Sequence, residues 1–239
     1  MKRRKGQFDF KQFSIKQECS AMKVGTDGVL LGAWTNVTGS KTVLDIGTGT
    51  GLIALMIAQR NPVASIHAIE IDQASAAEAL TNVSHSPWAD RVKVFHESIQ
   101  DFSAHATHAY DLIVSNPPFF NSGTASPSAN RHQARHTGQL PQKDLIQTVA
   151  GLLSDQGRFS VIIPVTESDN FISMAADYGL HPCHITTFFP KAHKPSERHL
   201  IEFTRTEGPA REDRLVQYLE HGEWTEGYKN LTRDFHIKL

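Results

Sequence analysis

The stretch "VLDIGTGTGLIAL", from Val43 to Leu55, decides how the rest of the chain is interpreted. A short apolar run leads into three glycines at alternate positions, Gly47, Gly49 and Gly51, and a second apolar run follows them. Glycine lets the backbone turn tightly and lets a ligand approach the main chain closely. The stretch therefore predicts a strand, a ligand-binding loop and a helix, which together form a unit of an α/β fold.

Strand and helix patterns alternate on both sides of this unit, which indicates a doubly wound α/β domain with a mostly parallel sheet. The expected strands are 8–17, 41–47, 65–72, 91–97, 109–115, 158–164, 183–189 and 198–205. The expected helices are 25–34, with Thr26 or Asp27 as its cap, 51–61, 73–86, 142–157, 166–179 and 225–235. Only residues 190–197 separate the last two strands, and a parallel crossover needs a longer connection. We therefore expect the last strand to run antiparallel to its neighbour.

The length and composition fit one domain, residues 1–239, with an extension of about 35 residues before the glycine loop. The net charge of -1 argues against a dedicated nucleic-acid binder, although "KRRK", "NRHQARH" and "KAHKPSERH" are local basic stretches. The two cysteines, Cys19 and Cys183, suggest free thiols in a reducing compartment. We read no export signal and no membrane span, so we expect a cytoplasmic protein. No ligand-spaced set of residues indicates a metal.

The spacing of the glycines argues against a dinucleotide site. In the pattern G-x-G-x-x-G the third glycine would stand at Leu52, one residue later than it does here. The loop instead reads Asp-x-Gly-x-Gly-x-Gly from Asp45, which is typical of methyltransferases that use S-adenosylmethionine. That cofactor has no pyrophosphate and carries an ammonium group, and an acidic side chain near the loop suits such a cation better than it suits a phosphate.

A second acid is expected about 20 residues later, at the end of the next strand, to bind the ribose hydroxyls. Glu70 stands there, and Asp72 is interpreted as the cap of the following helix. After the third strand, methyltransferases often carry an acid that bonds the adenine of the cofactor, but this chain has Ser98. Either Ser98 makes a weaker contact there or the backbone at Ile99 does.

The sequence "NPPF", Asn116 to Phe119, matches the (Asp/Asn/Ser)-Pro-Pro-aromatic signature of enzymes that methylate a planar amino nitrogen. The Asn116 side-chain oxygen and the Pro117 carbonyl can both accept hydrogen bonds from that amine, and the diproline makes the turn rigid. Phe119 offers a flat face for an extruded base. The catalytic candidates are Asn116, Pro117 and Phe119, and Asn116 is also a candidate for contact with the cofactor. The residues next to them predicted to contact the substrate are Pro118, Phe120, Arg131 and Arg135.

Nearly the whole chain resembles the bacterial tRNA1(Val) (adenine(37)-N6)-methyltransferase family. The residues that carry the resemblance are "FKQFSI", "AMKVGTDGVLLGAW", "VLDIGTGTGLIAL", "AIEID", "DLIVSNPPFF", "RHQARHT" and "TEGYKNLT". It implies a class I methyltransferase fold, Rossmann-like, with seven strands and a reversed last strand. It also implies that Lys23, Gly25 and Thr26 border S-adenosylmethionine and that the partner is tRNA. Ser98 departs from the pattern, as does Phe119, where tyrosine is common.

Two other substrates share the Asn-Pro-Pro-aromatic signature, namely guanine N2 in ribosomal RNA and a glutamine amide in a protein. Guanine enzymes often have histidine where this chain has Phe120, and glutamine enzymes carry a larger domain before the glycine loop. A cofactor-binding module without catalysis would be expected to have damaged motifs, and both motifs are intact here. The choice of valine tRNA comes from the resemblance alone. No protein partner is inferred, and a monomer is compatible with the sequence.

Overall fold

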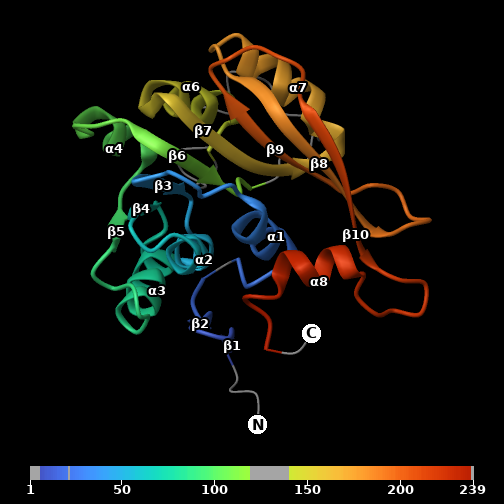
Figure 1. The fold of residues 1–239 in the computed structure, drawn as a ribbon. Helices are drawn as coiled ribbons and strands as arrows, with labels where there is room; N and C mark the ends of the chain where they lie inside the picture. Colours follow the sequence, from blue (N-terminus) through green and yellow to red (C-terminus); the bar gives the residue numbers. More distant parts are fainter. Residues whose placement is uncertain (1–5, 21, 119–139, 238–239) are drawn as a thin grey trace, which may run out of the picture.

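The computed structural model describes residues 6–20, 22–118 and 140–237, and Figure 1 shows their arrangement. In these residues the main sheet has eight strands, β3 (Thr42–Ile46), β4 (Ser65–Glu70), β5 (Val92–His96), β6 (Tyr110–Ser115), β7 (Leu153–Pro164), β8 (His181–Lys191), β9 (Arg198–Thr204) and β10 (Arg211–Tyr218). The helices are α1 (Thr26–Trp34), α2 (Leu52–Arg60), α3 (Gln73–Ser84), α4 (Ile99–His105), α6 (Gln142–Leu152), α7 (Val165–Ala176) and α8 (Glu226–Thr232). A small hairpin, β1 (Gln7–Asp9) and β2 (Ser14–Lys16), precedes α1.

The strand order is β10-β8-β9-β7-β6-β3-β4-β5, and β9 alone runs against its two neighbours. The predicted doubly wound α/β sheet with a reversed strand after β8 is confirmed. The predicted number of seven strands is wrong by one, because β10 adds to the edge of the sheet, parallel to β8. Its sequence opens with four charged residues, 211–214, and only Leu215 and Gln217 are buried in it. An edge strand that is mostly exposed lacks the apolar pattern by which strands are identified.

Other boundaries also differ from the predictions. The helix expected to run to Gly157 ends at Leu152, and Gly157 lies inside β7. A Cβ at Gly157 would lie 2.8 Å from the carbonyl oxygen of Tyr110, so glycine is needed there for close packing against β6. Helix α4 was not predicted, because it is short and buries only Ile99 and Phe102.

The N-terminal predictions need two corrections. The single strand expected over 8–17 is a hairpin of two three-residue strands. The cap of α1 is Gly25 and not Thr26 or Asp27, and no side chain caps this helix. The Asp27 carboxylate instead accepts a hydrogen bond from Arg198 of β9 at 3.0 Å. A predicted cap that is confirmed is Asp72, whose side chain accepts from the N–H of Ser75 at 2.8 Å.

Helices cover both faces of the sheet, with α1, α2, α3 and α8 on one side and α4, α6 and α7 on the other (Figure 1). Successive strand residues alternate between the two cores, so that Val43 packs with the first group of helices and Leu44 with the second. The central strands are therefore apolar on both faces, as parallel strands usually are.

The register of the sheet brings residues from three strands to one level at its carboxyl edge. Ile46 of β3 pairs with Ile69 of β4 and with Ser115 of β6. The residues that follow these three in the chain are Gly47, Glu70 and Asn116. Ligands of open α/β sheets bind at this edge, so the fold places the predicted motifs together.

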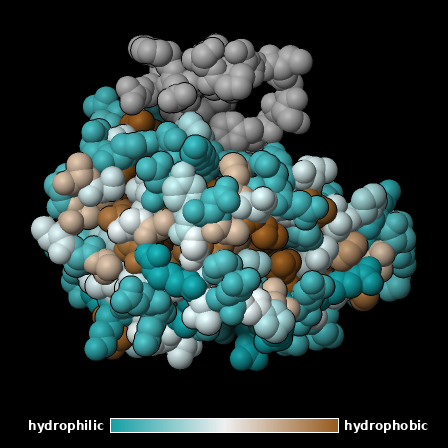
Figure 2. Space-filling model, turned by 90° about the horizontal axis from the view of Figure 1, so that it is seen from above, coloured by the Kyte–Doolittle hydropathy of each residue, from teal (hydrophilic) through white to brown (hydrophobic). Residues whose placement is uncertain are grey.

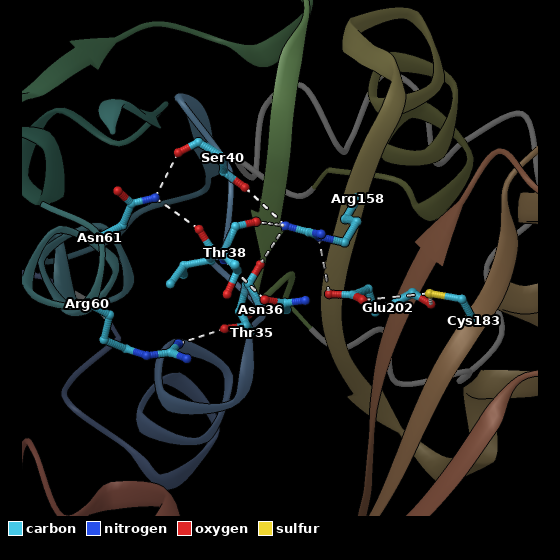
Figure 3. Close-up of polar contacts among 10 residues, drawn as sticks. Thr35, Asn36, Thr38, Ser40, Arg60, Asn61, Arg158, Cys183 and Glu202 are labelled. Carbon is cyan, nitrogen blue, oxygen red and sulfur yellow. Dashed lines mark hydrogen bonds and ion pairs between the residues drawn. The ribbon is translucent and has the colours of Figure 1, made fainter. Parts of the chain in front are cut away.

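The opposite edge is held by arginines that bond backbone carbonyls (Figure 3). Arg158 of β7 donates to the carbonyl of Thr38 at 2.7 Å and lies 3.9 Å from the Glu202 carboxylate of β9. Arg60 of α2 donates at 2.7 Å to the carbonyl of Thr35, just after α1. These contacts fix the connection between α1 and β3 far from the carboxyl edge.

Figure 2 shows the molecule from above the view of Figure 1, the side on which α6 and α7 lie. Hydrophilic residues cover most of this face, and the hydrophobic residues are scattered in small groups. Such a distribution is ordinary for a surface in contact with water. Among the described residues, no helix combines the length and the apolar character that crossing a membrane requires.

Candidate active site

The glycine loop has a backbone conformation that favours glycine at three positions. Gly47, Gly49 and Gly51 have φ angles of +72°, +56° and +82°. A Cβ at Gly47 or Gly49 would meet no atom within 4 Å, so the backbone angle and not crowding requires glycine there. The N–H groups of Gly47 and Thr48 both donate to the carbonyl of Ile69 at 2.9 Å. The loop is thus fixed to the end of β4 and has open space beside it.

Asp45 is fully buried at the end of β3, beneath this loop. Its Oδ2 accepts from the hydroxyl of Thr48 at 2.6 Å and from the N–H of Ala54 at 3.1 Å. Its Oδ1 is buried and has no hydrogen-bond partner among the described residues. Burial raises the pKa of the Asp45 carboxyl to about 7, against the lowering effect of the Thr48 and Ala54 hydrogen bonds. One carboxylate oxygen therefore shapes the loop, and the other is unpaired.

Glu70 links the glycine loop to the start of α3. Its Oε2 accepts from the N–H of Gly49 and its Oε1 from the N–H of Asp72, both at 2.9 Å. The side chain is 9% exposed, so it lies at the boundary between the interior and the carboxyl edge. The predicted ribose-binding acid is thus beside the loop, and its oxygens bond the backbone of both neighbouring segments.

Ser98 has a structural partner of its own. Its hydroxyl accepts from the N–H of Asp101 at 3.0 Å and lies 2.6 Å from an Asp101 carboxylate oxygen, so Ser98 caps α4. Glu97, just before it, lies 2.8 Å from His105. The side chains of Glu97 and Ser98 are therefore both paired with residues of α4.

Asn116 and the diproline follow β6 directly. Pro117 is buried, Pro118 is exposed, and Asn116 is half-buried. The Nδ2 of Asn116 donates to the sulfur of Met22 at 3.7 Å, whereas its Oδ1 is buried and without a hydrogen-bond partner among the described residues. A buried amide oxygen without a partner is costly, and such groups are often reserved for a ligand.

The segment that carries Lys23, Gly25 and Thr26 is brought to this site by Met22. All three residues are exposed. The N–H of Val24 donates to the side-chain oxygen of Gln17 at 2.7 Å, which holds the segment just before α1. Sequence reasoning missed Met22, because nothing in its own neighbourhood shows that it meets a residue 94 positions later.

Four of the predicted residues, Phe119, Phe120, Arg131 and Arg135, lie outside the described residues. The structure brings together Asp45, the three glycines, Glu70 and Asn116, and it places the segment of Lys23 to Thr26 beside them. Within 6–20, 22–118 and 140–237, no group of three His, Cys, Asp or Glu side chains is arranged to hold a metal ion.

Known proteins resemble this arrangement at two levels. The methyltransferase small-domain family matches residues 21–164, a range that contains every described site residue. The crystal structure of a predicted O-methyltransferase from Agrobacterium tumefaciens superimposes with a TM-score of 0.64 over 87% of this chain and 96% of that chain, at 16% identity. At that identity the likeness supports the fold alone.

Relatives of similar length are much closer in sequence. The tRNA1(Val) (adenine(37)-N6)-methyltransferase of Bacteroides fragilis is 43% identical over 97% of this chain and 98% of its own length. The protein of the same name from Trichodesmium erythraeum is 45% identical over the same shares. The chain thus belongs to the tRNA1(Val) (adenine(37)-N6)-methyltransferase family.

Proposed function

We propose that this enzyme transfers a methyl group from S-adenosylmethionine to N6 of adenine 37, next to the anticodon of a valine tRNA. The observation that carries the proposal is the Asn116 Oδ1 atom, a buried acceptor without a hydrogen-bond partner among the described residues, at the carboxyl edge of the sheet where the glycine loop begins. Its carboxamide and the neighbouring diproline suit a planar amine. Because tRNA is the substrate, we place the enzyme in the cytoplasm.

The residues present fit S-adenosylmethionine. The open space beside Gly47 and Gly49 admits a ligand against the backbone, and the free oxygen of Asp45 offers a counter-charge to an ammonium group. Glu70 would take the ribose hydroxyls, in exchange for its present bonds to the backbone. The further residues that we assign to this ligand are Gly51, Lys23, Gly25, Thr26 and the backbone at Ile99. The cofactor supplies an electrophilic methyl group, so the protein needs no metal to activate it.

The protein's own contribution is to make a poor nucleophile reactive. The lone pair of an adenine amine is delocalised into the ring, so the amine must turn before it can attack. The Asn116 Oδ1 and the Pro117 carbonyl accept hydrogen bonds from the two N–H groups of this amine and favour the pyramidal nitrogen of the transition state. Phe119 would hold the flipped base by stacking, and Pro118, Phe120, Arg131 and Arg135 would contact the RNA.

A panel of unmodified tRNA transcripts tests the substrate. With tritiated cofactor, we expect labelling of valine tRNA transcripts that carry adenine at position 37. Matched transcripts with guanine at this position should stay unlabelled. If the guanine transcripts were labelled equally, the site of methylation would be wrong, and a labelled ribosomal RNA fragment or protein would support one of the alternative substrates.

The role of Asn116 is tested by Asn116→Ala. We expect turnover to fall about 100-fold or more, because the variant loses an acceptor that acts in the transition state. The dissociation constant of the cofactor, measured by calorimetry, should stay within about threefold, since a contact made in the transition state adds little to ground-state binding. Asn230→Ala, an exposed position on α8, is the control. Loss of cofactor binding as large as the loss of turnover would contradict the role.

A further inference from the structure

Helix α3 has a buried polar face that holds the N-terminal segment. Ser75, Glu78 and Asn82, spaced three and four residues apart, lie on one side of the helix and are 5%, 8% and 2% exposed. The Glu78 carboxylate accepts from the N–H groups of three consecutive residues, 18–20, at 2.5, 3.1 and 2.9 Å. Asn82 bonds both backbone groups of Lys16, at 2.8 and 2.9 Å, and also donates to the carbonyl of Thr50 in the glycine loop at 2.9 Å.

These bonds fix the backbone on both sides of Met22. On one side, the Ser20 hydroxyl donates to the carbonyl of Met22 at 3.1 Å and lies 3.2 Å from the hydroxyl of Ser75. On the other side, Gln17 accepts from the N–H of Val24. Buried polar contacts therefore fix the backbone that carries Met22, although its side chain is 49% exposed.

Met22 meets one end of the Asn116 carboxamide and not the other. A thioether sulfur accepts hydrogen bonds weakly and cannot donate them. The NH2 end of Asn116 can therefore bond the sulfur, and the carbonyl end would be repelled by it. With Nδ2 at 3.7 Å from the sulfur, Oδ1 is the end of the carboxamide turned away from Met22, and it is a buried acceptor without a partner among the described residues.

We propose that Met22 is a positioning residue for methyl transfer, because it fixes which end of the Asn116 carboxamide faces the amine. This inference rests on the proposed function. Without the sulfur, the two ends of the carboxamide differ little in energy, and the group can rotate by half a turn. The NH2 end would then face the substrate amine, where two donors oppose each other.

Two substitutions at this position separate orientation from packing. Met22→Leu keeps an apolar side chain of similar volume but removes the acceptor. Met22→Gln is less similar to methionine in packing, but its carboxamide can turn an oxygen towards Nδ2 of Asn116. Met174→Leu is the matched control, because Met174 is also a partly buried methionine and lies on α7 in the second core.

We expect Met22→Leu to lower kcat about tenfold, with the KM for tRNA and the Kd for S-adenosylmethionine within about twofold of the original values. Met22→Gln should recover much of that loss, and Met174→Leu should leave kcat unchanged. A packing role predicts the reverse order, with leucine better tolerated than glutamine. Equal activity of Met22→Leu and the original protein, or lower activity of Met22→Gln than of Met22→Leu, would overturn the inference.

A measurement on Asn116 itself keeps this result separate from the substrate assignment. The side-chain amide signals of Asn116, identified by their loss in Asn116→Ala, can be followed by nitrogen-15 NMR without any RNA. They should broaden or double in Met22→Leu and stay single in Met22→Gln and Met174→Leu. Unchanged signals in Met22→Leu would refute the orienting contact, whereas failure of the tRNA transcripts alone would refute only the proposed substrate.

Discussion

At the scale of single residues, Asp45 shows a conflict between stability and binding. Its carboxyl is buried, and one of its oxygens has no hydrogen-bond partner in the part of the chain that the structure describes, so its ionised form is unfavourable in the free protein. A cationic ligand beside that oxygen would remove the cost. The site thus has a carboxyl whose ionised form a cationic ligand would stabilise, and without such a ligand its ionisation makes the protein less stable.

The pH dependence of unfolding tests this conflict. Burial raises the pKa of Asp45 to about 7 in the folded protein, above the ordinary aspartate value of 3.8, so the folded state keeps a proton that the unfolded state releases. The stability that the folded protein gains from holding this proton is therefore fully present below pH 4, and it is lost as the pH rises to about 7. Asparagine does not ionise, so Asp45→Asn does not lose this stability. Relative to the original protein, its free energy of unfolding should rise by about 1 kcal/mol for each pH unit between pH 4 and 7.

Urea unfolding of the cofactor-free protein at pH 5, 6, 7 and 8 measures this difference. The gap between Asp45→Asn and the original protein should widen from pH 5 to 7 and then level off. Asp90→Asn, at an exposed position, is the control for the removal of a carboxylate from the surface. A gap for Asp45→Asn that does not change with pH would mean that this carboxyl is already ionised at pH 5.

Some features of single residues, such as the turn glycines and the Asp72 cap, could be predicted from the sequence, for a physical reason. Glycines at positive φ, an acid at a strand end and a diproline are local requirements, so the chain shows them directly. Contacts across the fold are not local. The partner of Ser98 became clear only with the short helix that it caps, and the meeting of Met22 with Asn116 depends on how three elements pack.

At the scale of elements, α3 joins the N-terminal segment to the glycine loop through its polar face. Glu78→Ala should lower the free energy of unfolding by about 2–4 kcal/mol, because three backbone N–H groups lose a charged acceptor. Urea denaturation measures the loss. Glu226→Ala, whose carboxylate is exposed on α8 and pairs only with Lys229 among the described residues, should cost less than about 0.5 kcal/mol. Equal costs would show that the N-terminal segment does not depend on Glu78.

The elements that sequence reasoning found are those that bury a regular apolar face. The central strands, α2 and α3 show such faces, and their predicted order is confirmed. The elements it missed, α4 and β10, lie at the margins of the sheet and bury few side chains. The N-terminal hairpin was taken for one strand, because its two short strands together give the alternation of a longer one.

At the scale of the whole molecule, the carboxyl edge of the sheet carries the candidate site, and the opposite edge carries the arginine contacts that hold the connection before β3. Arg158 bonds the connection before β3 and lies near the Glu202 carboxylate. Burial raises the pKa of Glu202, although the nearby guanidinium opposes this shift. Arg158→Met should destabilise the protein by about 2–4 kcal/mol, because it leaves the buried Glu202 carboxylate without its cation and two backbone carbonyls without their donor. Since the site lies at the other edge, kcat at 25 °C should change less than about twofold.

The measurements are urea unfolding and initial rates on the same preparations. Arg211→Met, which removes an arginine that is 72% exposed, should change neither quantity noticeably. A fall in kcat that matches the fall in stability would show that the two edges are coupled, which the geometry does not lead us to expect.

The N-terminal segment also packs on residues that come late in the chain. Lys11 donates its N–H to the carbonyl of Phe235 at 2.9 Å, and Phe10 stacks near His236 with ring centroids 6.3 Å apart. During synthesis, the contacts of Phe10 and Lys11 therefore cannot form until the residues that follow α8 have left the ribosome. A nascent chain that has already made its glycine loop and diproline would still lack this part of the packing of its N-terminal segment until its translation is nearly finished.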